Sequence, residues 1–168
     1  MQEYTNRLSV SQTVSYDCDT DELWKIISEP GNLNNSHPFC KSNEAIQWSK
    51  EEHSDRLVYL NELNFIRNFL TWDEGLGYTL LIGEAGGPQS YVVWEIDSAP
   101  EGKSKLTITV YPHILAGLPI IIAYLPHTMW VRPRLQKYLR SVLSGYEYYL
   151  QNGKAVPRNH FGRHPWFS

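Results

Sequence analysis

The spacing of apolar positions changes from a strand period to a helix period at the start of the chain. Residues 8–16 alternate apolar and polar side chains, which is typical of a strand with one solvated face. Residues 21–28 carry an apolar helical stripe, preceded by Asp19 and Glu22 at capping-box spacing. A Pro-Gly pair ends this helix, and the polar segment 32–39 is either a second short helix or a loop.

The middle of the chain predicts strands only. No helical pattern of about ten residues interrupts it, and parallel strands would need such crossovers. Turns that contain Gly or Pro separate its segments, as in an antiparallel meander. The predicted strands lie near residues 43–48, 56–62, 65–73, 78–83, 90–97 and 105–111. Together with the first strand they give a curved antiparallel sheet of seven strands.

A long amphipathic helix is predicted for residues 133–152. Its apolar and aromatic side chains fall on one stripe from Leu135 to Leu150, with most basic residues away from it. Gly145 lies inside the helix, where it permits close contact with a bulky neighbour. The helix would be about 30 Å long, enough to cross a small sheet. We therefore predict an α+β fold in which this helix crosses the concave face and leaves a space that side chains do not fill.

Length and composition fit a single domain over residues 1–168. Six Trp and eleven Tyr supply large rings with polar tips that can meet a partner. No leader with a basic start and an apolar run is present, so we expect a cytoplasmic protein. Cys18 and Cys40 are then reduced thiols.

Charge is distributed unevenly along the chain. Residues 1–131 hold 8 Lys or Arg against 17 Asp or Glu, whereas residues 132–168 hold 7 against Glu147 alone. We favour a basic helix face beside an acidic sheet within one fold over a dedicated anionic partner. No nucleic-acid partner is expected.

Two stretches of the chain are similar to a known superfamily. The first comprises Val10-Ser-Gln-Thr-Val14, Asp21-Glu-Leu-Trp24-Lys-Ile-Ile27, Pro30-Gly-Asn-Leu33 and His37-Pro38. The second runs from Arg67 to Trp72-Asp73 and continues with Tyr78-Thr-Leu and Trp94-Glu-Ile96. With the order of elements, they resemble the START or birch-pollen-allergen-like (SRPBCC) superfamily, especially its polyketide cyclase and lipid-transport branch. The resemblance implies a helix-grip fold around a hydrophobic cavity, with ligands from lipids and sterols to aromatic polyketides, and no single reaction.

An apolar insertion, residues 114–131, separates the last predicted strand from the long helix. Pro119 and Pro126 break it, so it is no membrane span. Three interpretations remain open: core or a lid over the cavity, which we favour, a peripheral membrane contact, or a homodimer interface. The membrane interpretation depends on an apolar wedge beside cations suited to anionic headgroups. The membrane or lid candidates are Leu118, Ile121, Met129, Trp130, Arg132 and Arg134.

Catalytic and metal-binding motifs are absent from the sequence. There is no nucleophile elbow, no phosphate-binding Gly loop with Lys and no Cys pair at zinc spacing. His160 and His164 are spaced like helical metal ligands, but Gly162 and Pro165 argue against a helix there. We expect a solvated or surface-docked tail over residues 154–168, and neither metal nor cofactor.

Candidate ligand-binding residues are those placed on the concave side of the sheet, on the long helix or at the mouth. For each of these aromatics, simple core packing is an equal alternative. Arg67 and Asn68 occupy opposite faces of one strand, so only one can reach the interior. A buried Arg67 would need an acidic partner such as Glu95, or a ligand carboxylate. The candidates are His37, Tyr59, Trp72, Tyr78, Trp94 and Tyr146.

Three functional hypotheses follow. The first is binding or transport of a small hydrophobic or amphipathic ligand, such as a lipid, an isoprenoid or a polyketide-like molecule. The second is a cyclase or aromatase in which His37, His113 or Tyr59 moves a proton, supported only by the resemblance. The third is a lipid-binding module that docks peripherally on a membrane.

Overall fold

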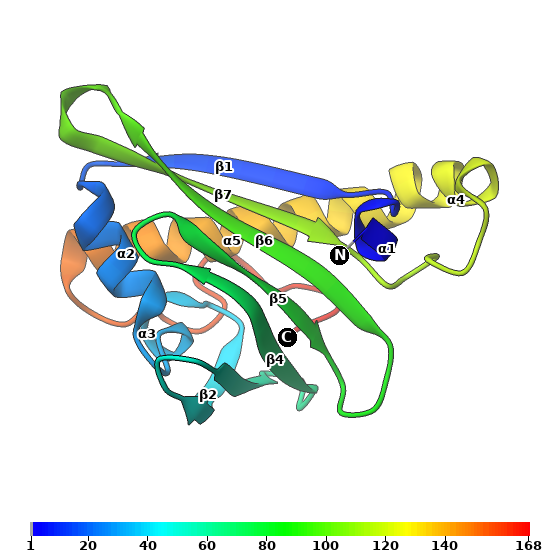
Figure 1. Ribbon diagram of the computed structural model, residues 1–168, viewed down its shortest axis with the longest axis horizontal. Helices are drawn as coiled ribbons and strands as arrows, with labels where there is room; N and C mark the ends of the chain where they lie inside the picture. The colour runs from blue at the N-terminus through cyan, green and yellow to red at the C-terminus, as the bar shows by residue number, and fades with distance from the viewer. Residues whose placement is uncertain (1) are drawn as a thin grey trace.

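Seven antiparallel strands form one curved sheet in the computed structural model, which describes residues 2–168 (Figure 1). The predicted sheet is confirmed, and each predicted strand end lies within three residues of the observed one. The order across the sheet is β1-β7-β6-β5-β4-β3-β2, so the first and last strands are neighbours. The strands are β1 (Val10–Tyr16), β2 (Cys40–Trp48), β3 (His53–Tyr59), β4 (Asn64–Asp73), β5 (Gly77–Gly83), β6 (Gln89–Ala99) and β7 (Lys103–Tyr111).

The largest displacement from the predicted bounds is at β3. This strand ends at Tyr59 rather than at residue 62. Glu62 adopts a left-handed backbone conformation with φ 68°, and its N–H donates to the Tyr59 carbonyl. A tight turn therefore joins β3 to β4 where the sequence pattern predicts more strand.

Short helices flank the sheet, and one long helix crosses its concave side. Asp19 caps α2 as predicted, because its side chain accepts a 2.8 Å hydrogen bond from the backbone N–H of Glu22. Gly153 ends α5 in the left-handed conformation with φ 61°. The helical segments are α1 (Gln2–Thr5), α2 (Thr20–Ser28), α3 (Leu33–Ser36), η1 (Pro100–Gly102), α4 (Ile120–Pro126), the π-helical turn η2 (His127–Val131) and α5 (Arg132–Asn152).

Gly145 is the point of closest approach between α5 and α3. A Cβ added at this glycine would lie 1.9 Å from the Ser36 carbonyl oxygen. The predicted close contact is therefore with the backbone of α3 rather than with a bulky side chain. It fixes α3 against the long helix at one end of the interior.

Most of the apolar insertion is neither core nor a lid, although Val131 lies in the hydrophobic core and Ile114 and Leu115 pack against it. Helix α4 lies at one end of the long axis of the molecule, beside α1 and away from the sheet interior (Figure 1). For residues 118–130 the favoured interpretation is wrong, because most of these side chains are exposed, while Ala123 and His127 are buried. The helix continues through Pro126 and the π-helical turn into α5, although the two prolines predict a break.

The C-terminal tail packs back onto the domain. Val156, His164 and Phe167 are buried, and the carbonyl of Trp166 accepts a 2.9 Å hydrogen bond from Asn61. His164 accepts a hydrogen bond from the Trp166 N–H, and its Nε2 lies 3.0 Å from the Arg134 carbonyl. The surface-docked alternative for the tail is thus the observed one. Among residues 2–168, no cluster of three or more potential metal ligands occurs.

Candidate ligand-binding interior

The interior between the concave face and α5 is mostly filled, and a cavity of about 90 Å³ remains. Strand alternation decides which side chains reach it, because every second residue of β3 to β7 points toward α5. Apolar side chains make up most of its wall. The wall comprises Leu33, His37, Leu57, Tyr59, Phe65, Arg67, Leu80, Ile82, Ser90, Val92, Trp94, Ile108, Val110, Leu135, Tyr138, Leu139, Val142 and Phe167.

A short chain of hydrogen bonds runs along the polar part of this wall. The Phe39 backbone N–H donates to Nδ1 of His37 at 3.2 Å, so the neutral ring carries its proton on Nε2. That Nε2–H donates to the Tyr138 hydroxyl at 2.9 Å, and the hydroxyls of Tyr138 and Tyr59 are 3.0 Å apart. A turn, a helix and a strand each contribute one of the three side chains.

This series of hydrogen bonds leaves one buried tyrosine hydroxyl without an acceptor for its hydrogen. The two tyrosine hydroxyls hold two hydrogens, and only one lies between their oxygens. Because Tyr138 already accepts from His37, the second hydrogen has no acceptor among the residues that the structure describes. One tyrosine O–H therefore remains available to an acceptor atom at the cavity wall.

Burial keeps all three groups neutral. The pKa of His37 is lowered to about 3, mainly by burial and in addition by the positive charges of Arg67 and Arg158. Burial also raises the pKa of Tyr138 and of Tyr59 above the ordinary value for a tyrosine. The site therefore presents neutral hydrogen-bonding groups at physiological pH.

A buried ion pair forms the other polar feature of the wall. Arg67 and Asp55 are directly opposite each other on β4 and β3. The Nε of Arg67 donates to Oδ1 of Asp55 at 2.7 Å, and its Nη2 pairs with Oδ2. Burial alone would lower the pKa of Arg67, but the Asp55 carboxylate outweighs it and holds that pKa above its ordinary value. Arg67 thus has an acidic partner as expected, but that partner is Asp55 instead of Glu95, which is exposed on β6.

The tail closes part of the interior. Phe167 is 9% exposed and stacks on Tyr59, with ring centroids 4.5 Å apart. Its ring also lies 4.5 Å from that of Tyr138 and 5.2 Å from that of His164. The last residues of the chain thus occupy space that would otherwise extend the cavity.

Three of the six candidate ligand-binding residues line the cavity, and the other three do not. His37, Tyr59 and Trp94 line the cavity. Trp72 is half-buried outside it and stacks on His53, with centroids 3.8 Å apart. Tyr78 and Tyr146 are buried in the core, where Tyr146 accepts a hydrogen bond from Asn32. Arg67 rather than Asn68 reaches the interior, because Asn68 is exposed.

Most wall residues were not among the six candidates, and two of these, Tyr138 and Phe167, shape the site. Tyr138 lies between the apolar stripe of α5 and its basic residues, so helical spacing alone gives it an ambiguous direction. Phe167 belongs to a tail whose Gly and Pro residues conceal any periodicity. The one available signal in the sequence was the pair of aromatic residues near the end of the tail, Trp166 and Phe167.

These features define a helix-grip α+β protein with a small interior cavity, whose wall is mostly apolar and carries a few polar groups. No family model matches the sequence, and no curated protein matches it. Solved structures match it in fold. A START superfamily protein from Mycobacterium smegmatis has a TM-score of 0.65 and 11% identity, over 87% of this chain and 99% of that one.

Two further structures extend the comparison. The di-domain ARO/CYC BexL from the BE-7585A biosynthetic pathway has a TM-score of 0.64 and 12% identity, over 86% of this chain. This chain covers 46% of BexL, so it spans about half of that protein. Ara h 8.0201 has a TM-score of 0.61 and 15% identity, over 86% of this chain and 99% of that one. The resemblance to the START or birch-pollen-allergen-like superfamily is confirmed at the level of the fold.

Proposed function

We propose that the protein binds a small apolar or amphipathic molecule that carries a hydrogen-bond acceptor. The ligand lies between the sheet and α5, with its acceptor atom at the Tyr59–Tyr138 pair. The observation that carries this proposal is the buried tyrosine O–H without an acceptor, at the wall of an otherwise apolar cavity. A carbonyl, hydroxyl or ether oxygen on an apolar body satisfies it.

The apolar wall supplies most of the affinity in this proposal. Each Å² of apolar ligand surface removed from water contributes roughly 25 cal/mol. One hydrogen bond to the tyrosine pair orients the ligand and contributes about 1 kcal/mol. The Arg67–Asp55 pair is already satisfied within the wall, so the ligand needs no charge.

The size of the cavity restricts the ligand or requires the tail to move. Pockets for drug-sized ligands measure roughly 300–1,000 Å³, so a cavity of about 90 Å³ accepts only a compact molecule. Withdrawal of Phe167 would add the space that its ring occupies. A longer lipid, isoprenoid or polyketide-like ligand would therefore enter as the tail is displaced.

The geometry favours binding over a cyclase or aromatase reaction. A general base needs a suitable pKa and an open path to its substrate. His37 uses both ring nitrogens in hydrogen bonds, and its partner is a tyrosine instead of a carboxylate. His113 does not line the cavity, and its Nδ1 is 3.0 Å from the hydroxyl of the wall residue Ser90. BexL is an ARO/CYC, and its likeness to this chain extends to the fold alone.

Native mass spectrometry of the protein purified from its own host tests the proposal. We expect a non-covalent adduct of a small molecule, released on denaturation. The test variant is Val92→Phe, which adds a ring to the cavity wall on β6. Its control is Val93→Phe, the neighbouring residue on the opposite face of that strand.

The two variants give opposite expectations. Val92→Phe should lose the adduct, whereas Val93→Phe should keep it, with circular dichroism confirming that both are folded. A wild-type protein that is always empty would refute the proposal. An adduct of unchanged stoichiometry on folded Val92→Phe would place the ligand outside the interior.

A further inference from the structure

Eight apolar and aromatic side chains are exposed together at one end of the molecule. Ile121 is 91% exposed and Met129 is 71% exposed, which is unusual for such side chains in one contiguous segment. They lie on α4, on the loop before it and on the π-helical turn after it. This surface, called the apolar end below, comprises Leu118, Ile120, Ile121, Ile122, Tyr124, Leu125, Met129 and Trp130.

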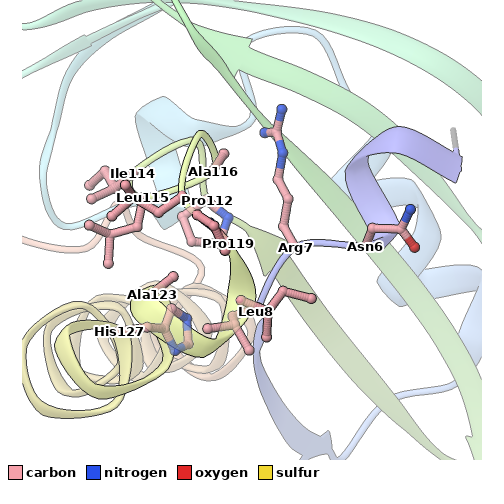
Figure 2. Close-up of a pocket in the computed structure, with 12 residues that line it drawn as sticks. Asn6, Arg7, Leu8, Pro112, Ile114, Leu115, Ala116, Pro119, Ala123 and His127 are labelled. Carbon is pink, nitrogen blue, oxygen red and sulfur yellow. The ribbon is translucent and has the colours of Figure 1, made fainter.

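The apolar end projects from the body instead of forming a flat face. Ile120, Ile121 and Ile122 are consecutive and all exposed, so apolar groups cover about 200° of the helix circumference. Ala123 and His127 face the body. A hollow of about 280 Å³ separates this helix from the N-terminal segment around Arg7, as Figure 2 shows.

Cations follow the apolar end directly along the chain, and the segment that carries them has no acidic residue. Arg132, Lys137 and Arg140 are exposed on α5, and Arg134 is half-buried. None of these four forms an ion pair with the described residues. Residues 106–146 contain no Asp or Glu. The segment from the apolar end into α5 therefore offers unpaired cations to an anionic partner.

Trp130 joins the apolar side chains to the cations. The guanidinium of Arg134 lies 5.1 Å from the Trp130 ring and donates to the Trp130 carbonyl at 2.9 Å. Trp166 from the tail packs edge-on against the same indole, with centroids 5.3 Å apart. Tryptophan beside arginine is typical of groups at the boundary between hydrocarbon and headgroups.

We propose that the apolar end inserts into the interfacial layer of an anionic phospholipid membrane, with Arg132 and Arg134 at the headgroups. When a helix that is apolar around more than half of its circumference inserts into a membrane, acyl chains cover all of its apolar sides. A second copy would cover one side only, and a two-fold contact would bring both sets of cations together. Among the described residues, no helix is long and apolar enough to cross a membrane.

The docking concerns a different surface from the interior cavity. None of the eight side chains lines that cavity. Membrane attachment therefore does not depend on the proposed ligand, and either can fail without the other.

Co-sedimentation with vesicles tests the docking. We expect binding to vesicles of phosphatidylcholine mixed with phosphatidylserine, and weak binding to pure phosphatidylcholine. Binding should weaken as salt is added, because the headgroup contacts are screened. The full chain is used, with sedimentation velocity measured in parallel without lipid.

Two variants separate the apolar contribution from the charged one. Ile121→Ser with Met129→Ser should weaken binding to the mixed vesicles by at least about tenfold. Arg132→Gln with Arg134→Gln should remove the difference between mixed and pure vesicles. The matched controls are Leu76→Ser, exposed on another surface, and Lys25→Gln with Lys105→Gln. Both controls should bind like the wild type.

Three outcomes would overturn the docking. The first is the absence of wild-type protein from the mixed-vesicle pellet. The second is unchanged binding by Ile121→Ser with Met129→Ser, confirmed as folded by circular dichroism. The third is a lipid-independent dimer that this variant dissociates, which would identify the apolar end as a contact between two copies.

Discussion

The ring of Phe167 stacks on the ring of Tyr59, with centroids 4.5 Å apart and planes 26° from parallel. Through this contact Phe167, the next-to-last residue, closes the wall of the interior beside the hydrogen bonds of His37, Tyr138 and Tyr59. The same ring contacts Tyr138, whose hydroxyl connects His37 to Tyr59. The tail therefore couples the size of the cavity to the stability of the domain.

Phe167→Ala should destabilise the domain and enlarge the cavity. Loss of a buried phenyl ring costs roughly 3–5 kcal/mol in a core, and we expect at least about 2 kcal/mol here because the tail can reposition. The added space should increase the fluorescence of an anilinonaphthalene dye in native buffer. Phe161→Ala is the control, since Phe161 is 37% exposed. Equal unfolding midpoints and equal dye signals in the two variants would contradict this role of the tail.

Breaking the buried pair of Arg67 and Asp55 should be strongly destabilising. Arg67→Met leaves the carboxylate buried without its partner, which costs roughly 3–5 kcal/mol. Arg67→Met combined with Asp55→Leu removes both charges and should be less destabilised than Arg67→Met alone. Urea unfolding measures both. Lys41→Met, which breaks the exposed pair with Glu62, should change stability by about 1 kcal/mol or less.

The elements were predictable because local rules determine them. Strand alternation, Gly- and Pro-containing turns and the Asp19 cap each act over a few residues, and the sheet and long helix followed from them. The end of β3 was less accurate, since it depends on the left-handed backbone conformation of Glu62, which is unusual for a residue other than Gly. Propensity alone does not specify such a position.

The interior was only partly predictable because its wall depends on long-range packing. Asp55 is the partner of Arg67 through the register of β3 and β4, which the sequence leaves open by one residue. Phe167 reaches the cavity through the fold of a tail without periodicity. The exposure of α4 was also missed, because an uncharged apolar run is more often buried than presented to a partner.

Gly145→Ala should destabilise the contact between α5 and α3. The added Cβ would lie 1.9 Å from the Ser36 carbonyl oxygen, so the helices must separate. Overpacking of this kind costs roughly 1–3 kcal/mol, more than the helix propensity that alanine adds. Gly117→Ala is the control, because nothing lies within 4 Å of its added Cβ. A thermal midpoint for Gly145→Ala at or above the wild-type value would show that the close approach carries no constraint.

The stability of the domain should fall as the pH drops from about 6.5 toward 3, partly through His37. Folding lowers the pKa of this imidazole to about 3, so within that range the unfolded chain binds a proton that the folded chain does not. One such proton gives a slope of about 1.4 kcal/mol per pH unit in the free energy of unfolding. His37→Gln should reduce the slope by about that amount even if it also lowers stability at neutral pH. His160→Gln, which removes an exposed histidine of the tail, is the matched control for the substitution. Equal slopes for wild type and His37→Gln in urea unfolding across this range would show that His37 is not held neutral in the interior.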